Sequence, residues 1–300
     1  MTTTFLHLGA NKAASTTLQR SLLSKTNDLV YLGEDCENFR DYQRTLSSLT
    51  YDDDFNFNFS VVEKLFSDFM SRARNLGLNF VYSNEDIMTS RVPSQVLTRM
   101  KKVLPGAKIF IILRNQLTAI PSWYANHGAF LKGVPRRYWR SFVSADDFME
   151  HFLEFFNYSP LDAFMYHKLL CRYGDAFGDS NIKFFLFEDL LQDSEKFWGS
   201  IANYLGVEPK QALKLVRNQQ DRPRITQRRF SLHKFTRFVP AVRNQRLPPF
   251  IENFIDSGPP VRNLGMGHWS EKIYEIYKRD NLLLCERFGL DLNAYGYPVE

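Results

Sequence analysis

The sequence predicts an α/β protein with a three-layer architecture, in which a parallel sheet has helices on both faces. Short, continuously apolar runs alternate with longer segments whose apolar residues recur at helical spacing, which is typical of strand–helix–strand units with a buried sheet. The 300 residues are 44% hydrophobic and 24% charged, which allows a sizeable core and excludes wholesale disorder. We expect a single domain over residues 1–300, with its core in about 1–206 and elaborations at 217–246 and 262–300.

The strands are predicted from apolar runs four to six residues long. Aromatic and β-branched residues dominate them, most clearly in the run Lys108-Ile-Phe-Ile-Ile-Leu113, and such residues favour strands. The five expected strands cover residues 5–8, 29–32, 80–83, 108–113 and 182–187.

The helices are predicted from the periodicity of the segments between these runs. Leu18, Leu22 and Leu23 share one helical face, and Pro93 stands near the first turn of another helix, where proline is accepted. The expected helices cover 15–24, 61–77, 93–103, 194–205, 209–216 and 270–288, and helical patterns also dominate 117–173.

Charge and cysteine content narrow the class of protein. The net charge is +5, but residues 217–246 hold eight arginines and one lysine against Asp221 alone, a local net charge of +8. Three cysteines lie far apart without metal-ligand spacing, so we expect reduced thiols and no metal. There is no apolar run long enough for a membrane helix and no signal-peptide pattern at Met1, so we expect a cytoplasmic protein without a membrane span.

An anion site is predicted where the first strand ends. The strand runs into Gly9-Ala-Asn-Lys12-Ala-Ala-Ser-Thr-Thr17 and then into a helix, whose first N–H groups lack partners and favour anions. Ala13 and Ala14 let the main chain approach an oxyanion, and hydroxyls from Ser15, Thr16 and Thr17 can donate to it. The pattern is not Walker A, because Lys12 stands three residues before Ser15. The alternative is an ordinary capped helix with a surface lysine.

A second anion motif follows the strand 108–113. Arg114 stands at the strand's carboxyl end, where a guanidinium suits a phosphate. Ser122 comes eight residues later, about two turns along the next helix. The alternative is an arginine that pairs with a surface carboxylate.

Together these motifs resemble those of sulfotransferases that use 3′-phosphoadenosine-5′-phosphosulfate (PAPS), and they occur in the same order on successive strand–helix units. The loop resembles that family's 5′-phosphosulfate loop, with Ala14 in place of its glycine. Alanine accepts helical dihedrals, so the loop is expected to keep its form if residue 14 does not need a positive φ. Arg114 and Ser122 resemble the pair that binds the 3′-phosphate of the donor.

The resemblance extends over essentially the whole chain. Phe184–Leu190 and Leu205-Gly206 are similar to the family's strand–Glu-Asp-Leu–helix element. The segment 262–269 is similar to its glycine loop, which implies nucleotide contacts from Arg262, Gly265 and Gly267. Residues 280–298 resemble the bacterial and carbohydrate branch. The resemblance implies a P-loop-NTPase-like sulfotransferase fold and sulfuryl transfer from PAPS, without metal, to a hydroxyl of a carbohydrate or glycan.

In this scheme Lys12 stabilises charge on the leaving phosphate, and a base removes the acceptor proton. Glu85 ends the strand before the Arg114 strand, where cytosolic members place their catalytic histidine. Glu34 lies 22 residues after Lys12, comparable to the position of a catalytic glutamate in heparan-type members. A surface or capping role is the alternative for each glutamate. His7, inside the first strand, is expected to be structural.

Two segments have open interpretations. The basic segment 217–246 either lines a channel for an anionic acceptor or forms a solvated face. The polar and aromatic residues 51–59 form either a substrate flap or a packed loop. Two other functions are alternatives: a kinase-like phosphoryl transferase, for which Walker A and a clear magnesium-binding Asp are lacking, and a nucleic-acid-binding protein, which would need a recognisable module.

Overall fold

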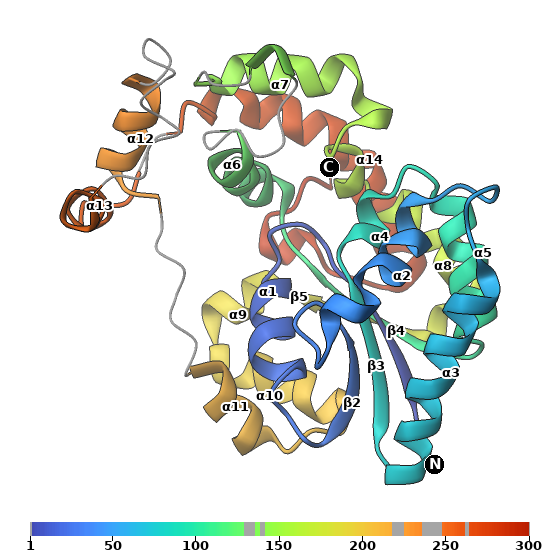
Figure 1. The fold of residues 1–300 in the computed structure, drawn as a ribbon. Coiled ribbons are helices and arrows are strands. Elements are labelled where there is room, and N and C mark those ends of the chain that lie inside the picture. Colours follow the sequence, from blue (N-terminus) through green and yellow to red (C-terminus); the bar gives the residue numbers. More distant parts are fainter. Residues whose placement is uncertain are drawn as a thin grey trace. The chain divides into compact units, whose positions relative to one another are not determined.

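The computed structural model describes residues 2–128, 136–138, 142–217, 225–235, 248–261 and 264–299 (Figure 1). Its contacts divide the chain into two compact units. The sheet unit comprises Met1–Asn115, Ala163–Gln220 and Arg279–Glu300, and the helical unit comprises Gln116–Asp162 and Asp221–Lys278. Among the described residues, none of the helices has the length and apolar character needed to cross a membrane. A single domain over 1–300 stays a prediction.

The sheet unit is built on five parallel strands in the order β2-β3-β1-β4-β5. The strands are β1 (Thr4–Leu8), β2 (Leu29–Gly33), β3 (Asn79–Asn84), β4 (Lys108–Leu113) and β5 (Ile182–Leu186). They coincide with the five predicted strands to within one or two residues. In the central strand Leu6 stands opposite both Tyr82 and Ile109. Because β1 has a neighbour on each side, the loop that follows it emerges at the middle of the sheet's carboxyl edge, where ligands bind in such folds.

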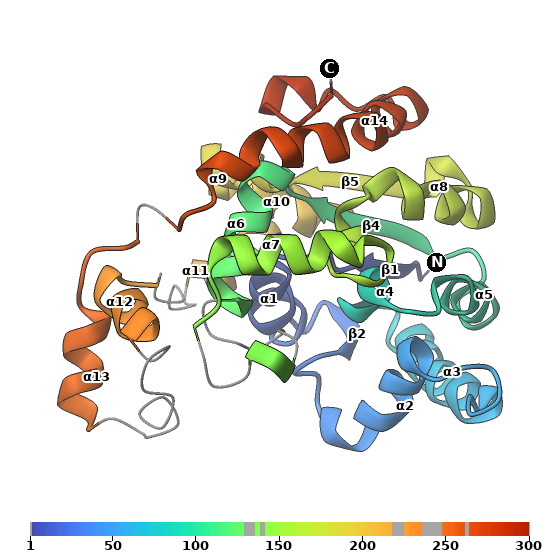
Figure 2. The same ribbon diagram turned by 90° about the horizontal axis from the view of Figure 1, so that it is seen from above.

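Helices cover both faces of this sheet (Figures 1 and 2). One face carries α1 (Ser15–Thr17), the π-helical turn η1 (Leu18–Leu23), α9 (Phe187–Gln192), α10 (Ser194–Leu205) and α11 (Pro209–Arg217). The other carries α2 (Phe39–Tyr51), α3 (Phe59–Leu76), α4 (Asp86–Thr89), α5 (Pro93–Val103) and α8 (Tyr166–Phe177). Short 3-10 turns lie at Asp162–Phe164, Asp179–Asn181 and Asn293–Tyr295. The predicted three-layer α/β class is confirmed.

Local signals fix where these helices begin and end. The Asn58 side chain accepts a hydrogen bond from the Val61 N–H and caps α3, and Asp193 caps α10 in the same way. Both helices end at glycines with left-handed dihedrals, Gly77 and Gly206, which is the usual terminator. The apolar stripes then pack on the sheet: the ring centroid of Phe66 in α3 lies 4.9 Å from that of Tyr82 in β3.

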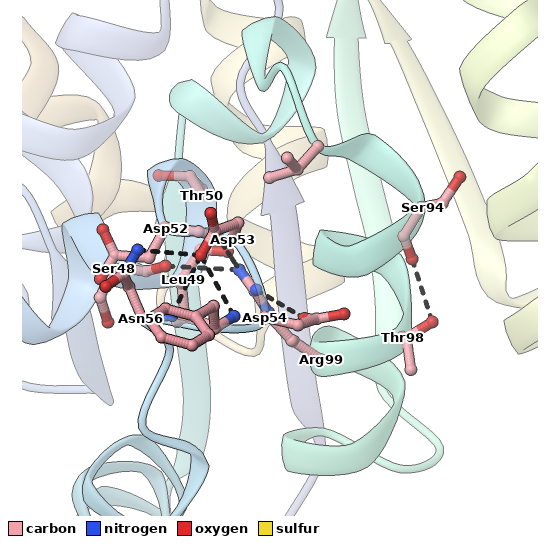
Figure 3. Close-up of polar contacts among 12 residues, drawn as sticks. Ser48, Leu49, Thr50, Asp52, Asp53, Asp54, Asn56, Ser94, Thr98 and Arg99 are labelled. Carbon is pink, nitrogen blue, oxygen red and sulfur yellow. Dashed lines mark hydrogen bonds and ion pairs between the residues drawn. The ribbon is translucent and has the colours of Figure 1, made fainter.

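The segment between α2 and α3 is a loop held by Arg99 of α5 (Figure 3). The Arg99 side chain is only 4% exposed, and its Nη1 donates to the carbonyl oxygens of Leu49 (3.1 Å) and Asp52 (2.7 Å). Its Nη2 bonds to the carboxylate of Asp54 at 2.8 Å, and the guanidinium lies 3.9 Å from the centre of the Phe57 ring. Arg99 thus anchors the segment, while Phe55 within it is 95% exposed, and both interpretations of residues 51–59 stay open.

The helical unit consists of α6 (Gln116–His127), α7 (Ala145–Glu154), α12 (Gln227–Phe235), α13 (Pro249–Asp256) and the first part of α14 (Ser270–Phe288), with 3-10 turns at Arg136–Tyr138, Phe156–Tyr158 and Gly267–Trp269. Its core is aromatic. Trp123 of α6 packs against Phe148 of α7 with ring centroids 4.7 Å apart, and the Tyr124 hydroxyl donates to the carbonyl of Val143. Helices in this part of the chain were predicted within 117–173 and over 270–288.

Candidate functional site

The loop after β1 has the backbone of an anion-binding turn. Lys12 (φ 64°) and Ala14 (φ 60°) are both in the left-handed region, and Ala13 between them is not. Such alternation turns successive N–H groups toward one point and forms a concave nest for an anion. The loop leads directly into the helical segment formed by α1 and η1.

Ala14 does not meet the condition on which its tolerance was predicted. Residue 14 takes a positive φ, where a side chain costs about 1–2 kcal/mol and glycine costs little. The condition under which alanine was expected to be tolerated here, a φ that need not be positive, is therefore not met. The loop keeps its form with strain stored at this position.

The hydroxyls beside the loop differ in what they can offer. The Ser15 side chain is buried, and its Oγ donates a 3.2 Å hydrogen bond to the carbonyl of Ala10. The Ser15 hydroxyl proton is therefore already used in a hydrogen bond within the loop. Thr16 and Thr17 are half-buried and are the better placed of the three predicted hydroxyl donors.

Arg114 connects the second motif to the loop. It follows β4, is half-buried, and its Nη1 donates a 2.8 Å hydrogen bond to the carbonyl of Lys12. Its guanidinium also lies 4.3 Å from the centre of the Phe187 ring. Burial lowers the pKa of Arg114, and Glu188 opposes that shift. The sheet therefore brings Arg114, from the second predicted anion motif, next to the loop that forms the first motif.

A set of hydrogen bonds that braces the chain beside Arg114 was not predicted from the sequence. Glu188 accepts hydrogen bonds from the main-chain N–H of Asn115 (3.0 Å) and from the Tyr297 hydroxyl (2.9 Å). The Asn115 amide donates to the carbonyl of Gly296 at 2.7 Å. The signal was available in principle, because Glu188 closely follows β5, the strand beside β4, and so reaches the same edge of the sheet.

Glu85 lies directly against the start of the loop. A Cβ atom at Gly9 would stand 2.5 Å from the Glu85 Cγ and 2.8 Å from its Cα, so only glycine fits under this glutamate. The Gly9 N–H reaches the carbonyl of Asn84 at 3.4 Å. The predicted base is thus in van der Waals contact with the predicted phosphate loop.

Glu34 lines the same cavity as Glu85. The cavity has a volume of about 250 Å³ and lies where β2 and β3 end. The Glu34 carboxylate pairs with Arg20 at 2.7 Å, and Arg20 also pairs with Asp35 at 2.6 Å. The two glutamates predicted as alternative bases therefore share one cavity, and the Glu34 carboxylate is engaged in an ion pair.

A buried polar cluster underlies this edge of the sheet. His7 is fully buried, its Nδ1 lies 2.7 Å from the Ser83 Oγ, and the same oxygen accepts from the Gln19 amide at 2.9 Å. Burial lowers the pKa of His7 to about 3, so the ring is neutral. This is the structural role predicted for His7, and it ties β1 and β3 to the helix after the loop.

The remaining predicted residues belong to the helical unit. Ser122 is half-buried in α6, Gly265 has a left-handed φ of 73°, and Gly267 opens a 3-10 turn. The pairing of Ser122 with Arg114 stays a prediction, and Arg262 lies outside the described residues.

The 3-10 turn that Gly267 opens is anchored to α7. Asp146 accepts bonds from the Trp269 indole (2.8 Å) and the His268 ring (2.7 Å). Both hydrogen bonds lower the pKa of Asp146, and the bond from Trp269 has the larger effect. The predicted glycine loop is therefore fixed at its carboxyl end.

The helical unit also contains a cavity that reaches this glycine segment. It has a volume of about 360 Å³, and its walls include Tyr124, Phe142, Phe230, Lys234 and Gly265. Flat aromatic walls suit a planar ring, and the charged groups among the described lining residues are one lysine, Lys234, and one carboxylate, Asp146.

The described arginines of the basic segment have partners. Arg217 pairs with Glu195, Arg229 with Asp256, and Arg228 donates to the carbonyl of Phe254 at 2.9 Å. The segment's other arginines lie outside the described residues. Among the residues that the structure describes, no group of three or more His, Cys, Asp or Glu side chains is arranged to hold a metal ion.

Comparison with known proteins bears on the fold. No protein-family model and no curated protein matches the sequence. Among solved structures, the sulfotransferase from Alicyclobacillus acidocaldarius superposes with a TM-score of 0.52 at 16% identity over 99% of both chains. The sulfotransferase domain of the Synechococcus PCC 7002 olefin synthase gives 0.45 at 14% identity, over 97% of this chain and 96% of that one. Mouse sulfotransferase SULT7A1, complexed with PAP, gives 0.44 at 12% identity, over 94% and 87%. The first likeness spans nearly all of both chains, and the chain therefore has the fold of a sulfotransferase.

Proposed function

We propose that this protein is a PAPS-dependent sulfotransferase that transfers the sulfuryl group to a hydroxyl of a carbohydrate or glycan. The observation that carries the proposal is the hydrogen bond from Arg114 to the carbonyl of Lys12. This bond supports the proposal because it joins a guanidinium, which suits a phosphate, to the loop after β1 at the carboxyl edge of a parallel sheet, where such folds bind ligands. A donor with a 3′-phosphate and a 5′-phosphosulfate requires two neighbouring anion sites of this kind.

The reaction is an in-line displacement at sulfur. The acceptor hydroxyl oxygen forms a new S–O bond while the bond between sulfur and the 5′-phosphate oxygen breaks, and the electron pair of that bond stays on the phosphate. The acceptor proton passes to a carboxylate. By analogy with phosphoryl transfer, positioning and charge stabilisation supply most of the rate enhancement.

The residues of the loop take the donor's 5′ end in this proposal. Lys12 neutralises charge on the leaving phosphate oxygen, and the main chain of Ala13 and Ala14 with the hydroxyls of Thr16 and Thr17 holds the oxyanion. The charges of the phosphates are balanced by lysine, arginine and N–H groups, without metal. Arg114 and Ser122 bind the 3′-phosphate, and Arg262, Gly265 and Gly267 cover the nucleotide.

Glu85 is the preferred base. Its Cα and Cγ atoms pack against Gly9 at the start of the loop, and this supports a position of the carboxylate near the donor's sulfate. Glu34 is the second choice, because its carboxylate is held by Arg20. A kinase-like phosphoryl transferase has no supporting observation in the described residues.

Calorimetry with two nucleotides tests the proposal. The 3′-phosphate makes a charge-assisted contact worth about 1.5–3 kcal/mol. We therefore expect 3′-phosphoadenosine-5′-phosphate (PAP) to bind about ten- to a hundredfold more tightly than adenosine monophosphate (AMP). Transfer of label from PAPS to an acceptor hydroxyl completes the test. Equal affinities for PAP and AMP would overturn the assignment.

A further inference from the structure

The cavity that holds Glu34 and Glu85 has an unusually acidic lining. Asp86 is the third carboxylate in its wall, and the amides of Gln19 and Gln43 add polar groups. Among the lining residues that the structure describes there is no lysine or arginine. Arg20, the cation next to Glu34, is already shared between Glu34 and Asp35.

A buried acceptor atom in this wall lacks a partner. Gln19 is 1% exposed, and its amide nitrogen donates to Ser83. Its Oε1 atom has no hydrogen-bond partner in the described part of the chain. A buried polar atom without a partner is costly, and Gln19 is a wall residue of the cavity. A hydroxyl or ammonium group that enters the cavity would satisfy this oxygen.

Asp86 contributes a half-buried carboxylate to the same wall. It stands at the start of α4, its N–H is bonded to the Asn84 side chain at 2.8 Å, and its carboxylate takes a hydrogen bond from Tyr51. Burial, and to a lesser degree the charge of Glu34, raises its pKa against the effect of Tyr51. A positive charge placed beside it would keep it ionised and would be attracted to it.

The cavity is small, and hydrogen bonds hold part of its wall in place. At about 250 Å³, it is below the range of about 300–1,000 Å³ typical of drug-sized ligands, so it suits a single ring. Part of its wall is α2, whose C-terminal carbonyls are held by the buried Arg99 (Figure 3).

We propose, on the basis of the proposed function, that this cavity binds the acceptor and that the acceptor is a single-ring polyol that carries an ammonium group. The ammonium group lies beside Asp86 and Glu34, a ring hydroxyl donates to Gln19 Oε1, and the reacting hydroxyl faces Glu85. An anionic acceptor is disfavoured by the same three carboxylates.

Three glucosides that differ only in the charge of a short substituent test this inference. With PAPS as donor, 2-aminoethyl, 2-hydroxyethyl and carboxymethyl glucoside are compared at pH 7. We expect kcat/KM for the aminoethyl compound to exceed that for the hydroxyethyl compound about tenfold and that for the carboxymethyl compound about a hundredfold. Equal values, or a preference for the carboxymethyl compound, would overturn the inference.

Two variants test whether Asp86 causes the preference for the aminoethyl compound. Asp86→Asn should lower the preference for aminoethyl over hydroxyethyl glucoside about tenfold, whereas Asp41→Asn, an exposed carboxylate on α2 outside the cavity, should leave it unchanged. If Asp86→Asn does not fold, Glu34→Gln replaces it, with a smaller expected loss because Arg20 partly neutralises Glu34. An unchanged preference in the folded variant would contradict the proposed position of the ammonium group.

PAP binding, measured in parallel, separates the two proposals. If PAP binds and the carboxymethyl compound is preferred, only the acceptor inference fails. If PAP does not bind, the proposed function is wrong and the inference falls with it.

Discussion

The guanidinium of Arg114 donates a hydrogen bond to the main-chain carbonyl of Lys12, 102 residues earlier in the chain, at 2.8 Å. Lys12 itself has a left-handed backbone, which a non-glycine residue adopts only when its surroundings hold it there. In the proposed function Arg114 is thus a binding group for one anion and a support for the loop that binds another. This double role distinguishes it from an arginine that only contacts phosphate.

Arg114→Ala should therefore weaken the binding of nucleotides that lack a 3′-phosphate as well as the binding of those that have one. A charged hydrogen bond contributes about 1.5–3 kcal/mol, so PAP affinity should fall about ten- to a hundredfold. AMP affinity should also fall, by a smaller factor, because the loop is released. Calorimetry measures both, with Arg74→Ala, an arginine bonded locally to Ser71, as control. Unchanged AMP affinity would show that the bond to Lys12 does not support the loop.

Glu85→Gln should cut kcat about 10²–10⁴-fold, as expected for loss of a general base, while PAP binding persists. Glutamine has nearly the same shape, so the packing of Glu85 over Gly9 is kept. Glu34→Gln is the matched comparison in the same cavity and should cost much less. Steady-state kinetics and calorimetry decide, and a disabled Glu34→Gln beside an active Glu85→Gln would transfer the role to Glu34.

Ala14→Gly should stabilise the protein by about 1 kcal/mol, because it relieves the left-handed strain at this position. Ala13→Gly is the control in the same loop. Ala13 is buried and has no positive φ, so glycine there should destabilise the fold. Urea unfolding of the three proteins measures the difference, and destabilisation by both substitutions would mean that residue 14 is not strained.

His7 should make stability depend on pH. Its pKa is about 3 in the folded chain against 6.5 when unperturbed, so between these values the unfolded chain binds a proton that the folded chain does not. The free energy of unfolding contributed by His7 is complete above pH 6.5 and falls by up to about 1.4 kcal/mol per pH unit below it.

The pH effect is isolated by comparison with His7→Asn. Urea unfolding of both proteins from about pH 7.5 to about pH 4.5, within the window where His7 titrates only in the unfolded chain, should show a steeper loss in the unsubstituted chain, since carboxylates contribute equally to both. Parallel curves would contradict a neutral, buried His7.

Gly9→Ala should destabilise the fold by about 1–3 kcal/mol, the usual cost of overpacking, because the new methyl group overlaps Glu85. The control is Gly199→Ala in α10, where an added Cβ meets nothing within 4 Å, and a gain of about 0.5–1 kcal/mol is expected. Thermal unfolding compares them, and a Gly9→Ala protein as stable as the parent would mean that Glu85 is not packed on Gly9.

Periodicity predicted the sheet well because its strands are buried on both faces and therefore continuously apolar. All residues from Ile109 to Leu113 are 0% exposed, and such a run is typical of a central strand. Helix α2 was missed, because few apolar residues mark its buried side: Leu46 and Leu49 are its buried large residues. The helix is instead held at its end by Arg99, which lies 47 residues beyond Asp52. Local sequence patterns do not predict a contact between such distant residues.

For the site, the motifs predicted which residues lie at the carboxyl edge but not how they are supported. Arg114 and Glu85 could be placed because each follows a strand. The brace from Glu188 and Tyr297 depends on tertiary contacts 109 residues apart in sequence. The left-handed φ of Ala14 was also hidden, because glycine, which usually marks such a backbone, is absent there.

The bond between Asn115 and Gly296 spans 181 residues, and this has a consequence for how the protein is made. During translation Arg114 and its neighbours leave the ribosome long before the residues that brace them. At about 5–20 residues per second, the delay is roughly 10–40 seconds. Throughout that time the sheet edge lacks Tyr297 and Gly296, so the hydrogen bonds that hold Asn115 and Glu188 in place are not yet formed. If the proposed function holds, we expect nucleotide binding to reach full strength only after nearly all of the residues described here have been synthesised.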